Sequence, residues 1–115
     1  MTPDWGDIVL VPVPFTDLSS RKRRPVIIIS NDDYNRHTQD VVVVAMTSNP
    51  FTSRFGFEIT SADLADGVLN RPGMVRPDKI YTLDQTLIVK RFGRVNRRTL
   101  ARIRRVLQGL TVQRP

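Results

Sequence analysis

Two residues of this sequence, Arg24 and Thr47, are suited by type and position to act on a phosphate. Arg24 is the last of four consecutive cations, and the apolar run of residues 26–29 follows it after a single proline. Thr47 directly follows a second apolar run, residues 41–46. An arginine can hold a phosphate through two hydrogen bonds at once, and a hydroxyl can bind one of its oxygens. If both runs are strands of one sheet, both side chains lie at strand ends and can face one rim.

Cleavage of RNA is the chemistry that such a pair could support. The ribose 2′-OH can attack the adjacent phosphorus without an external water, provided that the protein positions it and neutralises the charge on the phosphorane. Stabilisation of developing charge is often the largest single contribution to catalysis. The simpler structural interpretation is a solvated loop for residues 21–24 and the start of a turn at residues 47–50.

The other common catalytic sets are missing from the sequence. There is no cysteine, and His37 is the only histidine, so a nuclease built on two histidines is excluded. The sequence contains no zinc-protease, P-loop or dinucleotide-binding motif. The acidic residues occur singly or in polar loops, so we expect no metal cofactor.

The charge balance favours a nucleic-acid partner. Eighteen lysines and arginines face 11 acidic residues, which gives a net charge of +7 in 115 residues. All of the cations except Lys22, Lys79 and Lys90 are arginines, the side chain best suited to bidentate contact with phosphate and to stacking on bases. A genome of high GC content favours arginine codons and would give the same composition. The charge alone therefore does not decide between a nucleic-acid partner and codon usage.

Length and hydropathy predict one domain over residues 1–115. No apolar run is long enough to span a membrane, and residues 1–5 do not resemble a signal peptide, so we expect a cytoplasmic protein. Short apolar runs between turn residues predict a mainly β fold, with five to seven strands in a small closed or half-closed barrel. The expected strands are residues 8–13, 25–30, 41–46, 55–59, 73–77, 79–83 and 91–95.

The C-terminal part of the chain predicts one amphipathic helix. Asn96 is a suitable N-cap, and Gly109 is expected to stop the helix near its end. Apolar residues recur between these two positions at helical spacing, while most of the arginines lie off that face. The apolar face consists of Leu100, Ile103, Val106, Leu107 and Leu110. Residues 31–35 are expected to form a turn or a short helical turn, residues 84–90 a short turn, and residues 61–67 a loop or brief helix.

Four segments, in this order, resemble the MazF/PemK toxins. The first is the Gly-Asp-Ile-Val of residues 6–9, and the second is the Arg-Pro-Val-Ile-Ile-Ile-Ser-Asn of residues 24–31. The third is the run of residues 43–48 that contains Thr47, and the fourth is residues 80–84. With the C-terminal helix, the resemblance spans nearly the whole chain.

The resemblance implies a small SH3-like barrel of the CcdB/MazF type that is usually a homodimer. It implies a metal-independent, sequence-specific endoribonuclease for single-stranded RNA, with Arg24 and Thr47 as catalytic residues in proton transfer and phosphate stabilisation. The implied partner is a small antitoxin whose acidic tail covers the RNA groove. Residues expected to bind RNA are Arg21, Lys22, Arg23, Ser48 and, replacing a missing glutamate, Asp17.

The loop before Arg24 departs from the family pattern. Many members carry a Gly-Ser-Glu-Gln-like segment there, whereas residues 17–23 of this chain contain no glutamate and add three cations. Arg23 therefore competes with Arg24 for the functional position, and adjacency to Pro25 favours Arg24. Two alternatives stay open: a non-catalytic barrel that binds nucleic acid, and a CcdB-like poison of a protein target such as gyrase.

Overall fold

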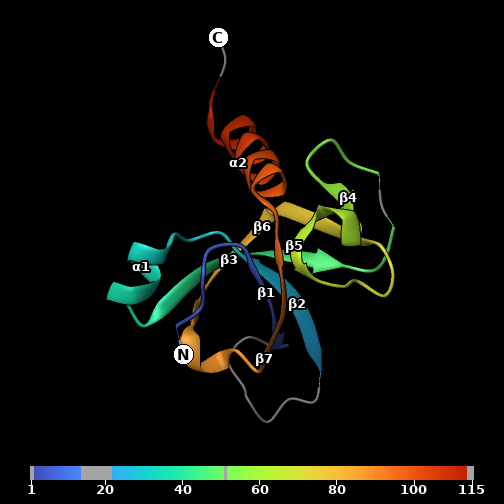
Figure 1. Cartoon of the computed structure of the whole chain (residues 1–115). Helices are drawn as coiled ribbons and strands as arrows, with labels where there is room; N and C mark the ends of the chain where they lie inside the picture. Colours follow the sequence, from blue (N-terminus) through green and yellow to red (C-terminus); the bar gives the residue numbers. More distant parts are fainter. Residues whose placement is uncertain (1, 14–21, 51, 114–115) are drawn as a thin grey trace.

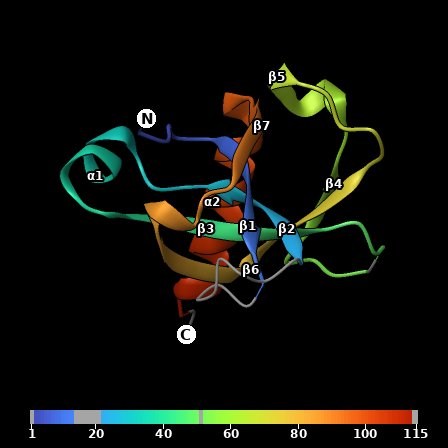
Figure 2. The ribbon, with the colours of Figure 1, turned by 90° about the horizontal axis from the view of Figure 1, so that it is seen from below.

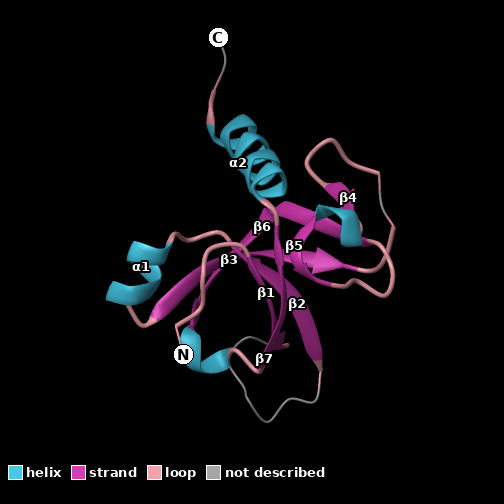
Figure 3. Ribbon diagram, viewed as in Figure 1, coloured by secondary structure: helices cyan, strands magenta, loops and turns pink. Residues whose placement is uncertain are grey.

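A computed structural model describes residues 2–13, 22–50 and 52–113. Within these ranges the chain forms one seven-stranded sheet with the strand order β4-β6-β3-β2-β1-β7-β5. All neighbouring strands are antiparallel, and the sheet curls into a half-barrel (Figure 1). The predicted mainly β, half-closed barrel with a C-terminal helix is therefore confirmed (Figure 3).

The strands differ greatly in length, and the helices are few. The strands are β1 (Asp7–Pro12), β2 (Arg23–Ile28), β3 (Asp40–Thr47), β4 (Phe57–Ile59), β5 (Leu64–Gly67), β6 (Gly73–Asp84) and β7 (Lys90–Val95). The α-helices are α1 (Asp32–His37) and α2 (Arg97–Thr111), and the 3₁₀ turns are η1 (Ser61–Asp63) and η2 (Gln85–Leu87). Figure 2 shows α1 at the start of β3 and β4 beyond its far end.

The central strands are buried on both faces, which explains their uninterrupted apolar sequences. Ile27 of β2 belongs to a cluster that includes Leu100 and Ile103 of α2. Its neighbours Val26 and Ile28 belong to a second cluster on the opposite face of the sheet. Successive side chains of a strand point to opposite faces, so β2 contributes to both clusters in turn. This double burial fixes the direction in which each residue at the strand ends points.

Strand β6 corrects the prediction of two short strands on either side of a proline bend. It is one strand of 12 residues whose pairing with β3 changes register. Val44 pairs with Ile80, whereas the next residue, Ala45, pairs with Arg76. Residues 77–79 therefore form a bulge, a position that suits Pro77 because it has no backbone N–H to donate.

Three further boundaries differ from the prediction. Strand β2 starts at Arg23, so Pro25 is its third residue and not its first. Strand β4 starts at Phe57, which leaves Phe55 in the preceding loop. Strand β5 replaces the loop expected near Gly67, where a positive φ of 92° and a close approach to the backbone of Phe92 suit only glycine.

Helix α2 begins as predicted and ends later. The Asn96 side chain accepts a hydrogen bond of 2.9 Å from the backbone N–H of Thr99 and caps the helix. The helix continues to Thr111, so the prediction that Gly109 stops it is wrong. A Cβ at Gly109 would meet nothing within 4 Å, because the outer half of the helix extends away from the sheet (Figure 1).

Candidate functional site at the rim of the sheet

Strands β2 and β3 bring Arg24 and Thr47 to the same rim of the sheet. The pairing of these strands ends at Val26 and Ala45, and Arg24 and Thr47 each lie two residues beyond that pair. Paired residues of an antiparallel sheet point to the same face, and every second residue shares that face. The alternation therefore directs both side chains to the face that carries Val26. Arg24 is exposed and Thr47 is half-buried.

The Arg24 guanidinium and the Thr47 hydroxyl can both bind a ligand, but their present contacts differ. Within the described ranges, Arg24 has no ion-pair partner. The Thr47 hydroxyl oxygen accepts a hydrogen bond of 3.2 Å from the backbone N–H of Asn49. A hydroxyl that accepts one bond can still donate its proton. The hydroxyl is thereby oriented by the turn that follows β3 and keeps its donor for a substrate oxygen.

A hollow of about 150 Å³, called here the rim hollow, opens beside Thr47. It lies between the ends of β2 and β3 and the segment that leads into β6. Gly73 of this segment lies against β3, and a Cβ there would come within 2.7 Å of the terminal methyl of Met46. The residues that face the rim hollow include Pro25, Thr47, Ser48, Asn70, Arg71 and Phe92.

Two arginines near the rim were missed by the sequence analysis. Arg71 lines the rim hollow from the segment before β6. Arg76 pairs with Ala45 across the sheet and so shares the face of Thr47. Its guanidinium binds Asp78 through two hydrogen bonds of 3.3 and 2.8 Å. An arginine two residues from an aspartate across a proline was the only sequence signal for this pair.

The other predicted site residues divide into three groups. Ser48 is exposed at the rim hollow, next to Thr47. Lys22 and Arg23 are exposed, and Arg23 pairs with Pro12 of β1, so it points to the opposite face from Arg24. Asp17 and Arg21 lie outside the described residues. Strand alternation thus places Arg24 and Thr47 on one face of the rim and Arg23 on the other, and Ser48 shares the rim hollow with Thr47.

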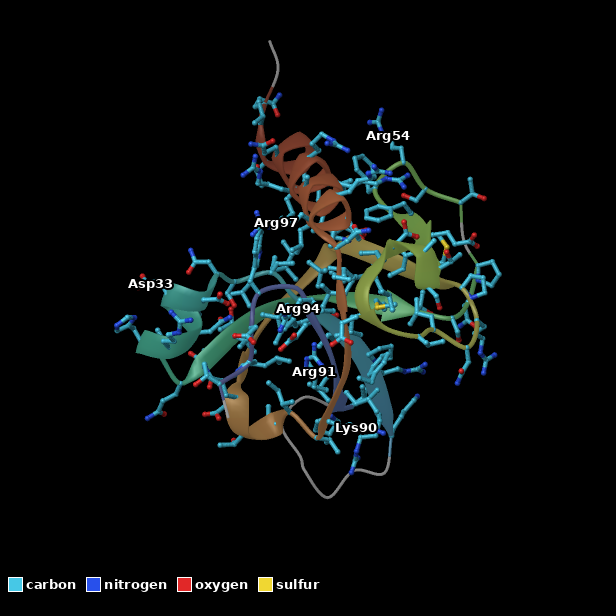
Figure 4. The ribbon with its side chains drawn as sticks, viewed as in Figure 1. Asp33, Arg54, Lys90, Arg91, Arg94 and Arg97 are labelled. Carbon is cyan, nitrogen blue, oxygen red and sulfur yellow. The ribbon has the colours of Figure 1, made fainter. Side chains whose placement is uncertain are left out.

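A separate cluster of arginines on β7 is fully occupied by carboxylates. Asp7 is almost completely buried and accepts hydrogen bonds of 2.9 Å from Arg91 and 3.1 Å from Arg94. Arg91 also binds Asp66 at 2.7 Å, and Arg94 binds Asp4 at 3.0 Å. We call these five residues the β7 ion network, and Figure 4 shows Arg91 and Arg94 over the same strand.

In the β7 ion network the pKa values of Asp66 and Arg91 are shifted in the directions expected for an ion pair. The hydrogen bond from Arg91, followed by its charge, lowers the pKa of Asp66. The hydrogen bonds to Asp66 and Asp7 raise the pKa of Arg91. The network therefore favours the charged form of both partners, as a structural ion pair does.

The described part of the chain offers no metal site and no membrane-spanning helix. No group of three or more histidine or acidic side chains there could hold a metal ion. No helix there is long and apolar enough to cross a membrane.

Comparison with solved structures identifies the fold as that of the MazF-type proteins. A MazE–MazF complex from Deinococcus radiodurans (Form-III) has a TM-score of 0.76 at 25% identity, covering 96% of each chain. Mycobacterium tuberculosis toxin MazF-mt6 has a TM-score of 0.71 at 18% identity, covering 90% of this chain and 93% of that chain, and supports the fold alone. An endoribonuclease in complex with its cognate antitoxin from a mycobacterial species has a TM-score of 0.77 at 28% identity, covering 98% of this chain and 99% of that chain.

The family follows from the sequence match. Residues 4–111 match the model of the PemK-like, MazF-like toxin of type II toxin–antitoxin systems, so the chain belongs to that family. No curated protein sequence matches the chain. The resemblance read from the four sequence segments is therefore confirmed.

Proposed function

We propose that this chain is the toxin of a type II toxin–antitoxin system and cleaves single-stranded RNA in a sequence-specific, metal-independent reaction. The observation that carries the proposal is the position of Arg24 and Thr47 on one face of one rim, where Thr47 also lines the rim hollow. Membership of the toxin family and the similarity to a mycobacterial endoribonuclease support the same activity. The proposal treats residues 1–115 as a single catalytic domain.

In the proposed reaction, the ribose 2′-oxygen attacks the adjacent phosphorus as the bond from phosphorus to the 5′-oxygen breaks. The 2′-OH loses a proton and the leaving 5′-oxygen gains one, so the products are a 2′,3′-cyclic phosphate and a 5′-OH end. The Arg24 guanidinium would bind two oxygens of the phosphorane, where negative charge develops. The Thr47 hydroxyl would donate to a non-bridging oxygen, and in this scheme the guanidinium supplies the positive charge that a metal supplies in other nucleases.

The neighbouring polar residues would guide the RNA strand toward this pair. Ser48 and Arg71 face the rim hollow and could contact the nucleotides on either side of the cleaved phosphate. We assign weaker, sequence-independent attraction of the backbone to Lys22 and Arg23, because both are exposed beside the rim. Arg21 and Asp17, in the sequence segment before Arg24, stay predicted RNA-binding residues.

Two protein partners complete the proposal. The mycobacterial relative is bound to its cognate antitoxin, and a chain of net charge +7 suits an antitoxin with an acidic tail. We further propose that the chain acts as a homodimer. The outer part of α2 supports this, because Leu110 is 40% exposed although it continues the apolar face of the helix.

The test is incubation of the purified protein with a long single-stranded RNA in EDTA, followed by mapping of the ends. We expect cleavage at one short motif, with cyclic phosphate and 5′-OH ends. Arg24→Ala and Thr47→Ala should each remove the activity, while Lys79→Ala, an exposed cation of the β6 bulge, serves as the charge control. Absence of cleavage by the wild type, or full cleavage by Arg24→Ala, would show that the enzyme assignment is wrong. Binding without cleavage would favour a nucleic-acid-binding barrel, and growth arrest with intact RNA would favour a poison of a protein target.

A further inference from the structure

A second concentration of arginines lies away from the rim, between the loop before β4 and the outer half of α2. A hollow of about 340 Å³ opens there, within the size range of ligand pockets. Figure 4 shows Arg54 on this loop, beside α2. We call it the arginine hollow, and it is lined by Arg54, Phe55, Arg102, Arg105, Val106 and Gly109.

Two of these arginines are held in place by aromatic rings. The Arg102 guanidinium carbon lies 4.1 Å from the centre of the Phe57 ring, and Phe57 is only 5% exposed. The Arg54 guanidinium carbon lies 4.8 Å from the centre of the neighbouring Phe55 ring. Stacking occupies one flat face of a guanidinium and leaves the N–H groups at its edge, and its other face, for a ligand.

No carboxylate in the described part of the chain neutralises these arginines. Within the described ranges, Arg54, Arg102 and Arg105 take part in no ion pair. The acidic residue next to Phe57 is Glu58, and strand alternation directs it to the opposite face of β4. The arginine hollow therefore keeps three positive charges around one concave surface, and an anionic ligand would relieve their mutual repulsion.

A nucleotide of single-stranded RNA suits this hollow better than an acidic peptide does. Planar guanidinium groups come from both walls, the loop and the helix, and proteins use such planes to stack unpaired bases. Their edges suit the phosphate of the same nucleotide. A peptide would need an apolar floor for its anchoring side chains, and only Phe55 and Val106 of the lining residues offer one.

The arginine hollow is also connected to the rim. Residues 48–56 run directly from Thr47 to the start of β4. Across the sheet, Thr47 pairs with Met74 and Met74 pairs with Glu58. Two strand spacings, about 10 Å, therefore separate Thr47 from β4. Thr47, Met74 and Glu58 share one face of the sheet, whereas Phe57 and the arginine hollow lie on the other. A strand of RNA that lies on the rim therefore reaches the hollow by passing round β4, the strand at the edge of the sheet.

We infer that the arginine hollow is a second RNA-binding site, which holds a nucleotide outside the cleaved position. The inference rests on the proposed function, because it concerns the same substrate. It implies that a long RNA binds more tightly than one that covers the rim alone.

The experiment compares two RNA lengths and uses charge-matched variants. Fluorescent single-stranded RNAs of about 6 and about 20 nucleotides are titrated with Thr47→Ala protein, which binds without cutting, at several salt concentrations. Arg54→Gln with Arg105→Gln removes two charges from the hollow. Arg98→Gln with Arg104→Gln removes two exposed charges from α2 outside it. Arg102 is kept because its stacking on Phe57 supports the fold.

We expect the Arg54/Arg105 variant to bind the long RNA about tenfold or more weakly, and the short RNA almost normally. Its salt dependence for the long RNA should fall by about 1.4 in the slope of log K against log salt, which corresponds to two lost phosphate contacts on a single strand. The Arg98/Arg104 variant should change the affinity for the long RNA and its salt dependence much less. Equal losses in the two variants would overturn the inference, because they would report net charge alone.

A second pair of variants tests the hollow without removing an arginine. Gly109→Glu places a carboxylate at the arginine hollow, where an added Cβ would meet no atom within 4 Å, and Gln108→Glu adds the same charge at the adjacent exposed position. We expect only Gly109→Glu to weaken binding of the long RNA. The opposite result is that the Arg54/Arg105 variant and Gly109→Glu both bind RNA normally but bind a glutamate-rich peptide more weakly. The hollow would then serve an acidic protein partner, and the inference would be wrong.

The binding data separate this inference from the proposed function. If the wild type leaves RNA uncut in EDTA while the hollow variants lose affinity for the long RNA, the cleavage assignment fails and the second site stands. If the wild type cleaves and the hollow variants bind the long RNA normally, the second site fails alone.

Discussion

The arginines of β7 and the arginines of the rim and the arginine hollow differ in what they are bound to. Arg91 and Arg94 each contact two carboxylates, one of them the buried Asp7. Arg24 at the rim and Arg54 in the hollow contact no carboxylate in the described part of the chain. The comparison shows that the excess of arginine is not uniform: one set holds strands together, and the other leaves positive charge open to a ligand.

The physical cause of the difference is burial. A carboxylate such as Asp7, with 2% of its surface exposed, must be paired, because an unpaired buried charge costs several kcal/mol. An exposed arginine is solvated and needs no partner. Cations that contact no carboxylate of the described residues lie at the rim and in the arginine hollow, and they create a positive field that can attract a polyanion.

Replacement of the Thr47 hydroxyl should have the largest effect. Thr47→Val keeps the shape of the side chain and removes its donor, so we expect cleavage to slow by about 100-fold or more. Thr47→Ser keeps the hydroxyl and should restore most of the rate. Single-turnover cleavage of one RNA measures both. A Thr47→Val protein as active as Thr47→Ser would remove the hydroxyl from the proposed mechanism.

Loss of the buried charge of the β7 ion network should have the next largest effect, and on stability. Asp7→Asn removes the charge shared by two arginines and turns an amide N–H₂ toward the Asp4 backbone N–H, which now donates to Asp7 at 2.9 Å. We expect the free energy of unfolding in urea to fall by about 2 to 4 kcal/mol. The control is Asp33→Asn, whose side chain is 86% exposed and should change stability little. Equal losses in the two variants would contradict a structural role for the network.

Removal of the arginine that lines the rim hollow should have a smaller effect, which is on substrate binding. Arg71→Gln takes one cation from the rim hollow and leaves the proposed catalytic pair intact. We expect KM to rise about three- to tenfold with kcat almost unchanged, because a contact made equally in the ground and transition states affects binding alone. A fall in kcat with an unchanged KM would instead place Arg71 among the catalytic residues.

The smallest effect should be the pH dependence contributed by Asp66. Because Arg91 lowers the pKa of this carboxyl in the folded state, the ion pair contributes its full stability above the unfolded pKa of about 4 and loses it as the pH falls through the lower folded value. The difference in unfolding free energy between wild type and Asp66→Asn should therefore be largest near pH 7 and shrink below pH 4. Since the side chain is 59% exposed, 1 M salt should also reduce it. Urea unfolding at pH 7, 5 and 3 measures the trend, and a difference that stays constant to pH 3 would contradict it.

The sequence predicted most of the sheet because its central strands are buried on both faces. The apolar runs at residues 26–29 and 41–46 must be buried in the core, so their sequences predicted β2 and β3 and the rim that these strands share. The boundaries next to prolines were wrong, because register depends on the partner strand. Pro25 and Pro77 lie inside β2 and β6, where the pairing of the neighbours accommodates them.

The parts of the sites that the sequence did not predict depend on contacts between distant segments. Arg71 and Thr47 line one hollow because the segment before β6 lies against the end of β3, and Arg54 and Arg105 line another because the loop before β4 lies beside α2. The sequence also does not show which arginines form ion pairs. Arg24 and Arg94 look alike there, and the fold gives a buried carboxylate to Arg94 alone.

That contrast gives the most direct test of the account. Arg24→Gln and Arg94→Gln remove the same charge, one from the rim and one from the β7 ion network. The measurement is the single-turnover cleavage rate of both variants well below their unfolding temperatures, together with urea unfolding. We predict that Arg24→Gln loses cleavage by about 100-fold or more with stability unchanged, and that Arg94→Gln keeps its rate within about threefold but is less stable. Equal rates in the two variants, or a larger loss of cleavage in Arg94→Gln, would contradict it.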